Sequence, residues 1–197
     1  MATLRDGTVH DLPGVYRVCR LTGLAGQDAS AVTTDPDLLG HVWAGHYLLA
    51  PGAIALVVQD EQGVAGYCLA APDTATHEAW VEERWLPPLR ARHPRGTGTG
   101  LDATLVEHLH DPPRTDLTLL ADHPAHLHID LLPRLQGRGW GRRLLEDMTA
   151  RLAAAGASGV HLGVDHTNTG AVAFYERLGF TELRQVPGTH LLGRRLT

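Results

Sequence analysis

The stretch that decides the fold is residues 126–180, HLHIDLLPRLQGRGWGRRLLEDMTARLAAAGASGVHLGVDHTNTGAVAFYERLGF. Polar and apolar residues alternate over 126–131, which is typical of a half-exposed β-strand. A glycine-rich turn, QGRGWG, follows at 136–141. Residues 142–154 then place their leucines and a methionine on one helical face. The sequence therefore predicts a strand, a glycine loop and an amphipathic helix in succession.

The second half of this stretch predicts another strand and another helix. Residues 160–164 are a short apolar strand, and Asn168 is a helix cap. The apolar face of the last helix includes Tyr175, and Gly179 ends the helix.

The glycine loop has the composition of an anion-binding turn. Its glycines let a phosphate approach the backbone N–H groups, and the helix start behind them carries a partial positive charge. Arg138, Arg142 and Arg143 crowd the same place, and cations in a first turn call for a compensating anion such as a pyrophosphate. A tight turn with solvated arginines is the alternative interpretation. The loop does not match the motif of dinucleotide-binding proteins, because Arg142 stands where that motif has its third glycine.

Two motifs in this stretch resemble the signatures of the GNAT superfamily of acetyltransferases. Gln136-x-x-Gly139-x-Gly141, after a strand and opening a helix, is similar to the family's acetyl-CoA loop, and NTGAVAFYERLGF at 168–180 is similar to its second signature. Residues 85–89 and 123–130 also resemble the acetyltransferase-like C-terminal domain of animal O-GlcNAcases, a domain that has lost the glycine loop.

The resemblance implies an α/β GNAT fold, with a mixed, largely antiparallel sheet of six to seven strands and helices on both faces. It implies that acetyl-CoA is the co-substrate. The residues it implies for binding acetyl-CoA are Leu131, Leu132, Gln136, Gly137, Arg138, Gly139, Trp140, Gly141, Arg142, Arg143, Asn168 and Tyr175. Among these, the loop amides would hold the pyrophosphate and the main chain of Leu131 and Leu132 would pair with the pantetheine arm.

Two residues are the catalytic candidates. Strand alternation puts Asp130 on one face with His126 and His128, next to the loop, where it would act as a base or attract the acceptor ammonium. A strand-end Asp paired with an Arg is the alternative, and a histidine in the cleft could relay protons. By resemblance, Tyr175 would give a proton to the departing thiolate; it could equally be a core aromatic.

Composition excludes several other classes. The formal charge is −5 and all 17 basic residues are Arg, so Lys-dependent phosphate loops and Schiff bases are ruled out. The acidic balance disfavours nucleic acid, and no apolar run is long enough for a membrane helix. The histidines lack a familiar metal-ligand spacing, so no metal is expected. Only two cysteines occur, Cys19 and Cys68, which favours the cytoplasm and a place for both in the core.

The rest of the chain fits one domain over 1–197. We expect a strand at 3–5, a helix from 11, a helix over 36–48, a hairpin of 54–59 and 64–71, an insertion at about 73–122, and a strand at 189–196. The predicted activity is direct acetyl transfer to a small-molecule or peptide amine by a monomer or homodimer. Acetylation of protein amines and a non-catalytic acetyl-CoA-binding module remain the alternatives.

Overall fold

The computed structural model describes residues 1–196, apart from the side chain of Leu117; Thr197, the last residue of the expected domain, lies outside the described residues. The described chain forms one seven-stranded sheet in the order β1-β2-β3-β4-β5-β7-β6, in which only β4 and β5 pair in parallel. This confirms the predicted mixed, largely antiparallel sheet. The strands are β1 (Thr3–Asp6), β2 (Ile54–Asp60), β3 (Gly63–Ala71), β4 (Ala125–Leu131), β5 (Gly159–Asp165), β6 (Thr181–Val186) and β7 (Thr189–Arg195).

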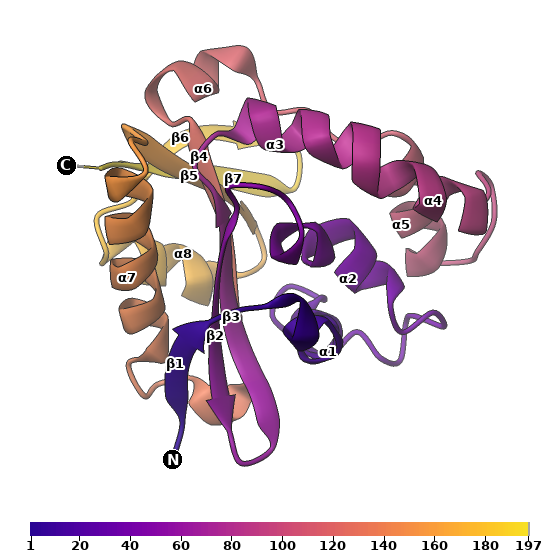
Figure 1. Ribbon diagram of the computed structural model, residues 1–197, viewed down its shortest axis with the longest axis horizontal. Coiled ribbons are helices and arrows are strands. Elements are labelled where there is room, and N and C mark those ends of the chain that lie inside the picture. Colours follow the sequence, from indigo (N-terminus) through magenta and orange to yellow (C-terminus); the bar gives the residue numbers. More distant parts are fainter. Residues whose placement is uncertain (197) are drawn as a thin grey trace.

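Helices cover both faces of the sheet, as predicted. Helices α7 and α8 lie on one side of it, and α1 to α5 lie on the other (Figure 1). The helices are α1 (Leu12–Thr22), α2 (Leu38–Trp43), α3 (Thr74–Trp80), α4 (Leu86–Arg92), α5 (Leu101–His110), α6 (Leu117–Asp122), α7 (Trp140–Ala154) and α8 (Thr169–Glu176). Four shorter turns are η1 (Val9–Asp11), η2 (Gly45–Leu48), the π-helical η3 (Val81–Trp85) and η4 (Pro133–Leu135).

Two local predictions were wrong. The helix expected over 36–48 is divided into α2 and η2, because the backbone leaves helical angles at Ala44 (φ −136°). There the chain passes close to Tyr16, whose ring a Cβ at Gly45 would overlap. Strand β6 was not expected. It is an edge strand that pairs only with β7 and is exposed at five of its six residues, so no alternation of polar and apolar residues marks it.

Residues 73–122 leave the sheet after β3 and return to it at β4. Because β3 and β4 are hydrogen-bonded neighbours, helices α3 to α6 form one long excursion between adjacent strands. That this excursion is an insertion into one domain stays a prediction.

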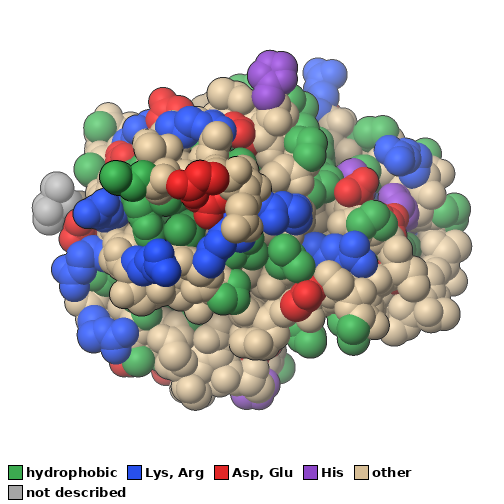
Figure 2. All heavy atoms as spheres, turned by 90° about the horizontal axis from the view of Figure 1, so that it is seen from below, with side chains coloured by type: hydrophobic (Ala, Val, Ile, Leu, Met, Phe, Trp, Pro, Cys, Tyr) green, Lys and Arg blue, Asp and Glu red, His purple; other side chains and the backbone are tan. Residues whose placement is uncertain are grey.

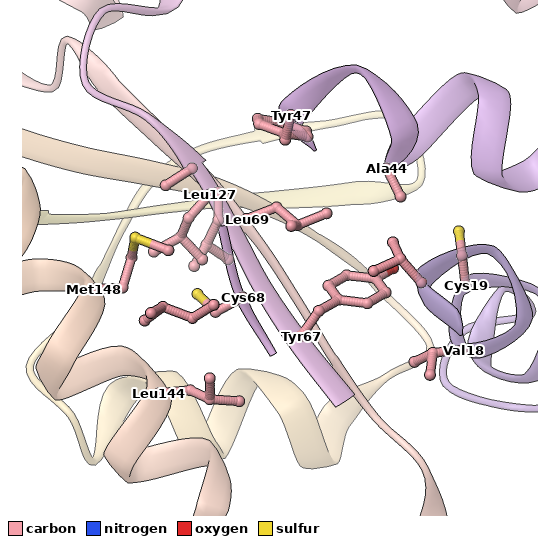
Figure 3. Close-up of a cluster of buried hydrophobic side chains, with 14 of the residues drawn as sticks. Val18, Cys19, Ala44, Tyr47, Tyr67, Cys68, Leu69, Leu127, Leu144 and Met148 are labelled. Carbon is pink, nitrogen blue, oxygen red and sulfur yellow. The ribbon is translucent and has the colours of Figure 1, made fainter. Parts of the chain in front are cut away.

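The core lies on both faces of the central strands. Tyr67 and Leu69 of β3 point toward α1 and η2, whereas Cys68 points toward Leu144 and Met148 of α7 (Figure 3). This is the period-two alternation of a strand that is covered on both sides. Fully burying one leucine such as Leu144 stabilises the fold by about 1.5–3 kcal/mol.

Strands β4 and β5 separate soon after they meet. Their pairing covers only Ala125 with Val160 and His126 with His161. Beyond these pairs each strand continues for several residues without pairing with the other strand. The fold therefore opens a gap in the sheet just before the glycine loop. No helix of residues 1–196 has the length and apolar character needed to cross a membrane.

Candidate functional site

A cleft of about 630 Å³ opens where β4 and β5 separate. Its wall comes from the end of α1 and the turn after it, the end of β4, the glycine loop and α8. The predicted site residues in this wall are Asp130, Leu131, Gln136, Gly137, Gly139, Gly141, Arg142, Asn168 and Tyr175. Four predicted residues lie outside it, namely Leu132, Arg138, Trp140 and Arg143.

Two glycines shape the loop. Gly137 (φ 69°) and Gly139 (φ 81°) adopt left-handed angles that favour glycine. A Cβ at either position would meet no atom within 4 Å, so the space in front of the loop is open. Gly139 is also the N-cap of α7, whose first N–H groups have no acceptor within the helix. The loop thus offers N–H groups and the positive end of a helix dipole to an anion.

The three arginines near the loop diverge. Arg142 lines the cleft and lies 3.6 Å from Glu146, one helical turn on. Arg143 instead lies over the ring of Trp140, with 5.0 Å between its guanidinium carbon and the ring centroid. Figure 2 views the molecule from the end at which α7 begins, and it shows arginine side chains beside acidic side chains on that face. Of the three arginines expected there, only Arg142 lines the cleft; Arg142 and Arg143 diverge because successive residues of a helix point in different directions. Arg177, at the end of α8, lines the cleft as well and was not expected.

The end of β4 leaves one backbone edge toward the gap. The N–H of Leu132 donates to the carbonyl of Ala65 on β3 at 2.9 Å, so this amide is not available to a ligand, contrary to expectation. Backbone groups alternate sides along a strand, so the N–H of Leu131 is directed away from β3 and toward the gap. The carbonyl of Leu131 accepts a hydrogen bond from Gln136 Nε2 at 2.8 Å. Leu131 therefore supplies the free amide that Leu132 does not.

Asp130 lies half-buried in the cleft wall. The hydroxyl of Tyr67 donates to its Oδ2 at 2.6 Å. Burial raises the pKa of Asp130 to about 6, and the hydrogen bond from Tyr67 acts in the opposite direction. Among residues 1–196 Asp130 forms no salt bridge, so the alternative of a structural Asp–Arg pair is wrong. A carboxylate with this pKa is largely ionised at neutral pH and faces a cleft.

Tyr175 of α8 also lies in the cleft wall. Its ring packs edge-on against Phe174 and Phe180, with centroids 5.3 and 5.5 Å away. The residue is only 7 % exposed, and its hydroxyl has no hydrogen-bond partner among the described residues. Burial, followed by the nearby charge of Asp130, raises the pKa of Tyr175 above its usual range. Tyr175 is thus both a packed aromatic and a protonated hydroxyl in the cleft wall.

Asn168 caps a helix and also lines the cleft. Its Oδ1 accepts a hydrogen bond from the N–H of Ala171 at 3.1 Å, which caps α8. This interaction holds the helix that carries Tyr175. The cap was expected from the sequence, and it occupies the side-chain oxygen that a ligand would otherwise meet.

His126 and His128 do not reach the cleft as a proton relay. They share a face with Asp130, as predicted, but belong to a histidine cluster with His46 of η2 and His77 of α3. In this cluster His46 Nδ1 lies 2.8 Å from His77 Nε2, and His126 Nδ1 lies 2.8 Å from the hydroxyl of Thr74. Within the described residues, no group of three or more ligating side chains is arranged to hold a metal ion.

The histidine cluster predicts acid instability. Burial lowers the pKa of His77 and of His128 from 6.5 to about 4, and it also lowers the pKa values of His46 and His126 well below 6.5. The unfolded chain therefore binds more protons than the folded protein between these values. We expect the free energy of unfolding to fall as the pH falls from 6.5 to 4, by up to about 3 kcal/mol for each of His77 and His128. Asp130, whose pKa is raised, contributes with the opposite sign over about pH 6 to 4.

Urea unfolding between pH 4.5 and 7.5 measures this effect. His128→Gln removes one titrating group and should lower the slope of stability against pH by about 1.4 kcal/mol per pH unit near pH 5. His166, which is exposed just beyond β5 and outside the histidine cluster, provides the matched control variant, His166→Gln, for the loss of a histidine as such. Equal slopes for the parent and His128→Gln would mean that His128 is not held neutral by the fold.

The turn after α1 contributes wall residues that the sequence did not reveal. Thr22, Ala25, Gly26 and Gln27 line the cleft, and Leu24 and Gln27 exchange backbone hydrogen bonds across the turn. Ala25 has a positive φ of 49°, the only such value for a residue other than glycine among residues 1–196. No local pattern identifies this turn as part of the site, because it is more than 100 residues away in sequence from the loop it faces.

A second hollow of about 770 Å³ adjoins the first one. The two share Ala25, Gln27, Asn168 and Gly170 in their walls. Asp165 and His166 line the second hollow, and Asp165 Oδ1 accepts hydrogen bonds from the N–H and hydroxyl of Thr167, a turn arrangement. The two hollows therefore lie on either side of one shared wall.

Comparison with known proteins gives a consistent result. The profile of the acetyltransferase (GNAT) family matches residues 27–180. The crystal structure of SsHAT has a TM-score of 0.91 with 37 % identity, covering 100 % of this chain and 98 % of that one. The structure of YncA, a putative acetyltransferase from Salmonella typhimurium with its cofactor acetyl-CoA, has a TM-score of 0.59 with 16 % identity, covering 100 % of this chain and 95 % of that one. At this identity the likeness to YncA supports only a shared fold.

Curated relatives are the O-GlcNAcases of Rattus norvegicus and Mus musculus, with 23 % and 22 % identity over 98 % of this chain. The chain spans 22 % of the length of these relatives. The family profile covers most of the chain, including β4, the glycine loop and α8 around the cleft. The chain belongs to the acetyltransferase (GNAT) family.

Proposed function

We propose that the protein transfers an acetyl group from acetyl-CoA to an amine by direct attack within a ternary complex. One observation carries the proposal. A single cleft brings together an anion-binding glycine loop, a free strand edge, an ionisable carboxylate and a protonated tyrosine hydroxyl. Membership of the acetyltransferase family supports this reading of the cleft.

The residues of the cleft suit the parts of acetyl-CoA. The backbone N–H groups of 137–142 and the guanidinium of Arg142 would hold the pyrophosphate, since the space in front of Gly137 and Gly139 is open. The free N–H of Leu131 would pair with the pantetheine arm or stabilise the oxyanion of the tetrahedral intermediate. Both roles depend on β4 parting from β5, because a paired strand has no edge to offer.

Asp130 would attract the acceptor across the wall that the two hollows share. An alkyl ammonium has a pKa near 10.4, about four units above that of Asp130, so removing its proton directly is strongly uphill. Electrostatic attraction of the ammonium therefore suits this carboxylate better than complete proton removal does. The neutral amine in equilibrium with the ammonium would be the attacking form, and the proton that its nitrogen loses after attack, when that nitrogen is far more acidic, would pass to Asp130 or to solvent.

Tyr175 would stabilise the departing thiolate. The raised pKa of its hydroxyl means that Tyr175 keeps its proton at neutral pH. A thiol has a pKa near 8.5, so full transfer from this tyrosine would be uphill, while a hydrogen bond to the developing charge would be favourable. Hydrogen-bond donation is accordingly the role that the surroundings of Tyr175 favour.

A route through an acetylated cysteine is disfavoured. Burial raises the pKa of Cys19 to about 12 and also raises that of Cys68. The thiolate is the nucleophilic form of cysteine, so neither residue is prepared to attack. Both side chains lie in the core, as expected from the sequence.

Calorimetry with acetyl-CoA, followed by a panel of small amines and lysine peptides, tests the proposal. We expect micromolar binding, on the order of −8 kcal/mol, and transfer to at least one amine. An absence of binding would overturn the proposal. Binding without transfer to small amines or peptides would favour a non-catalytic acetyl-CoA-binding module, and transfer to peptides alone would favour a protein substrate.

Asp130→Asn is expected to lower acetyl transfer at least about tenfold. The change keeps the size of the side chain and removes the charge that would attract the ammonium. Acetyl-CoA affinity should not change, since no phosphate contact is lost. An anchor would mainly raise the acceptor KM, whereas a base would remove a rising limb near pH 6 from the rate profile.

Thermal unfolding of Asp130→Asn is the necessary control, because the new amide must replace a carboxylate that accepts from Tyr67. A folded variant that binds acetyl-CoA and acetylates its amine at the parent rate would assign Asp130 a purely structural role.

A further inference from the structure

Tyr67 and Asp130 face one another across two central strands. They are direct partners in the antiparallel pairing of β3 with β4, and their side chains lie on the same face of the sheet. The hydroxyl of Tyr67 donates to Asp130 Oδ2 at 2.6 Å, a short, charge-assisted hydrogen bond. Tyr67 itself is only 1 % exposed, while Asp130 lines the cleft. The pair therefore links the core to the candidate site.

The two carboxylate oxygens of Asp130 have different surroundings. Oδ2 is held by Tyr67, whereas no residue of 1–196 donates a hydrogen bond of ordinary geometry to Oδ1, which is not among their fully buried unpaired atoms. The hydroxyl of Thr22, which donates to the carbonyl of Val18, also lies near the carboxylate and lowers its pKa. Oδ1 therefore keeps contact with solvent in the cleft. A carboxylate fixed through one oxygen presents the other in a defined direction.

The Tyr67 ring is held firmly enough to fix a partner. It is among the largest fully buried side chains and lies against Val18 and Cys19 of α1 (Figure 3). A tyrosine has only two side-chain torsions, and packing on this face restricts both. The hydroxyl consequently stands at a defined place at the end of a rigid ring.

We propose that Tyr67 is a positioning residue for the reaction, which fixes Asp130 with Oδ1 toward the acceptor and keeps its carboxylate charged. The inference rests on the proposed function, because it assigns Asp130 its task there. Hydrogen bonding to the charged form opposes the effect of burial on the carboxylate. Without the phenol, only the Thr22 hydroxyl would remain beside the carboxylate, so Asp130 would be held less firmly and would be neutral over more of the physiological pH range.

Few other groups near Asp130 can account for a change in its titration. Cys19 of α1, Cys68 of β3, Tyr175 of α8 and Tyr67 itself all have raised pKa values, so they stay neutral between pH 5 and 8. His128, the next residue on the same face of β4, has its pKa lowered to about 4 and is also neutral there. Within this group Asp130 alone changes charge near pH 6.

Tyr67→Phe tests the inference, because it removes one oxygen and keeps the ring. We expect carbon-13 NMR of the aspartate carboxyl carbons, with Asp130→Asn to assign the signal, to show the pKa of Asp130 rising by about one unit. Because only the ionised carboxylate attracts the ammonium, the acidic limb of kcat/KM for the amine should move by the same amount. In the Asp130→Asn background, Tyr67→Phe should have no further effect on turnover.

Tyr47→Phe is the matched control. Tyr47 of η2 is buried on the same face of the sheet, stacked on His77, and forms no hydrogen bond to Asp130. This variant should leave the Asp130 titration and the rate profile unchanged. An unchanged titration and rate profile in Tyr67→Phe would overturn the inference and leave Tyr67 as a packing residue.

Tyr67→3-fluorotyrosine covers the case in which Tyr67→Phe does not fold. Fluorine makes the phenol a stronger donor, so the pKa of Asp130 should fall instead of rise, and a shift in the other direction would contradict the proposal. The NMR titration uses the protein without ligand and needs no activity. A failure of acetyl-CoA binding, which would overturn the proposed function, is thus separate from a failure of the Tyr67–Asp130 link.

Discussion

Gly139→Asp is expected to reduce the affinity for acetyl-CoA at least about 100-fold. At the N-cap of α7 the new carboxylate would stand where the loop amides are proposed to hold the pyrophosphate, so it would repel an anion at this end of the helix dipole. Such a loss corresponds to about 2.7 kcal/mol of binding free energy. Calorimetry on the parent and the variant measures it directly.

Two controls separate charge from backbone strain. Gly139→Asn has the same shape without the charge, and asparagine tolerates left-handed angles, so we expect a loss of no more than about tenfold. Gly156→Asp places the same charge at the other end of α7, at a glycine that also has a positive φ and open space around it. This variant should bind acetyl-CoA like the parent. If Gly139→Asp also bound like the parent, the loop would not be the pyrophosphate site.

Tyr175→Phe is expected to lower turnover about 100-fold with little change in acetyl-CoA affinity. The phenylalanine ring keeps the packing against Phe174 and Phe180, so the fold should be almost undisturbed. What is lost is the hydroxyl that would donate to the departing thiolate. Steady-state kinetics with a saturating amine, together with calorimetry, measures the two effects separately.

An acyl donor with a better leaving group sharpens the test of Tyr175. If the hydroxyl stabilises the leaving thiolate, a donor whose thiol has a lower pKa should partly restore the activity of Tyr175→Phe. Tyr175 would be assigned to the core alone if the variant and the parent turned over at equal rates.

The local pattern of residues was enough to predict the strand, loop and helices around the cleft. Alternation over 126–131, the glycines of 136–141 and the helical spacing beyond them give β4, the loop and α7 in order, and Asn168 caps α8 as expected. These signals are local: a strand face, a left-handed turn and a helix cap depend on residues a few positions apart. Strand β6 was missed because an exposed edge strand lacks that periodicity.

The contacts that side chains make were harder to predict than the helices and strands themselves. Alternation places His126, His128 and Asp130 on one face of β4, but it does not say what covers that face. In the folded protein, His46 and His77 cover the first part of it and form the histidine cluster, while only Asp130 extends to the cleft. The amide of Leu132 is likewise occupied by Ala65, a partner on another strand.

The sequence by itself determined that this chain has a strand, a glycine-rich loop and a helix in the order of an acetyltransferase, because backbone preference and hydrophobic period act over short distances. Only the tertiary structure decided that Tyr67 holds Asp130, 63 residues away, and that the turn at Ala25 lines the cleft. Such contacts depend on strand register and on which helix covers which face. Both are set by the packing of the whole core, so the residues of one segment are not enough to predict them.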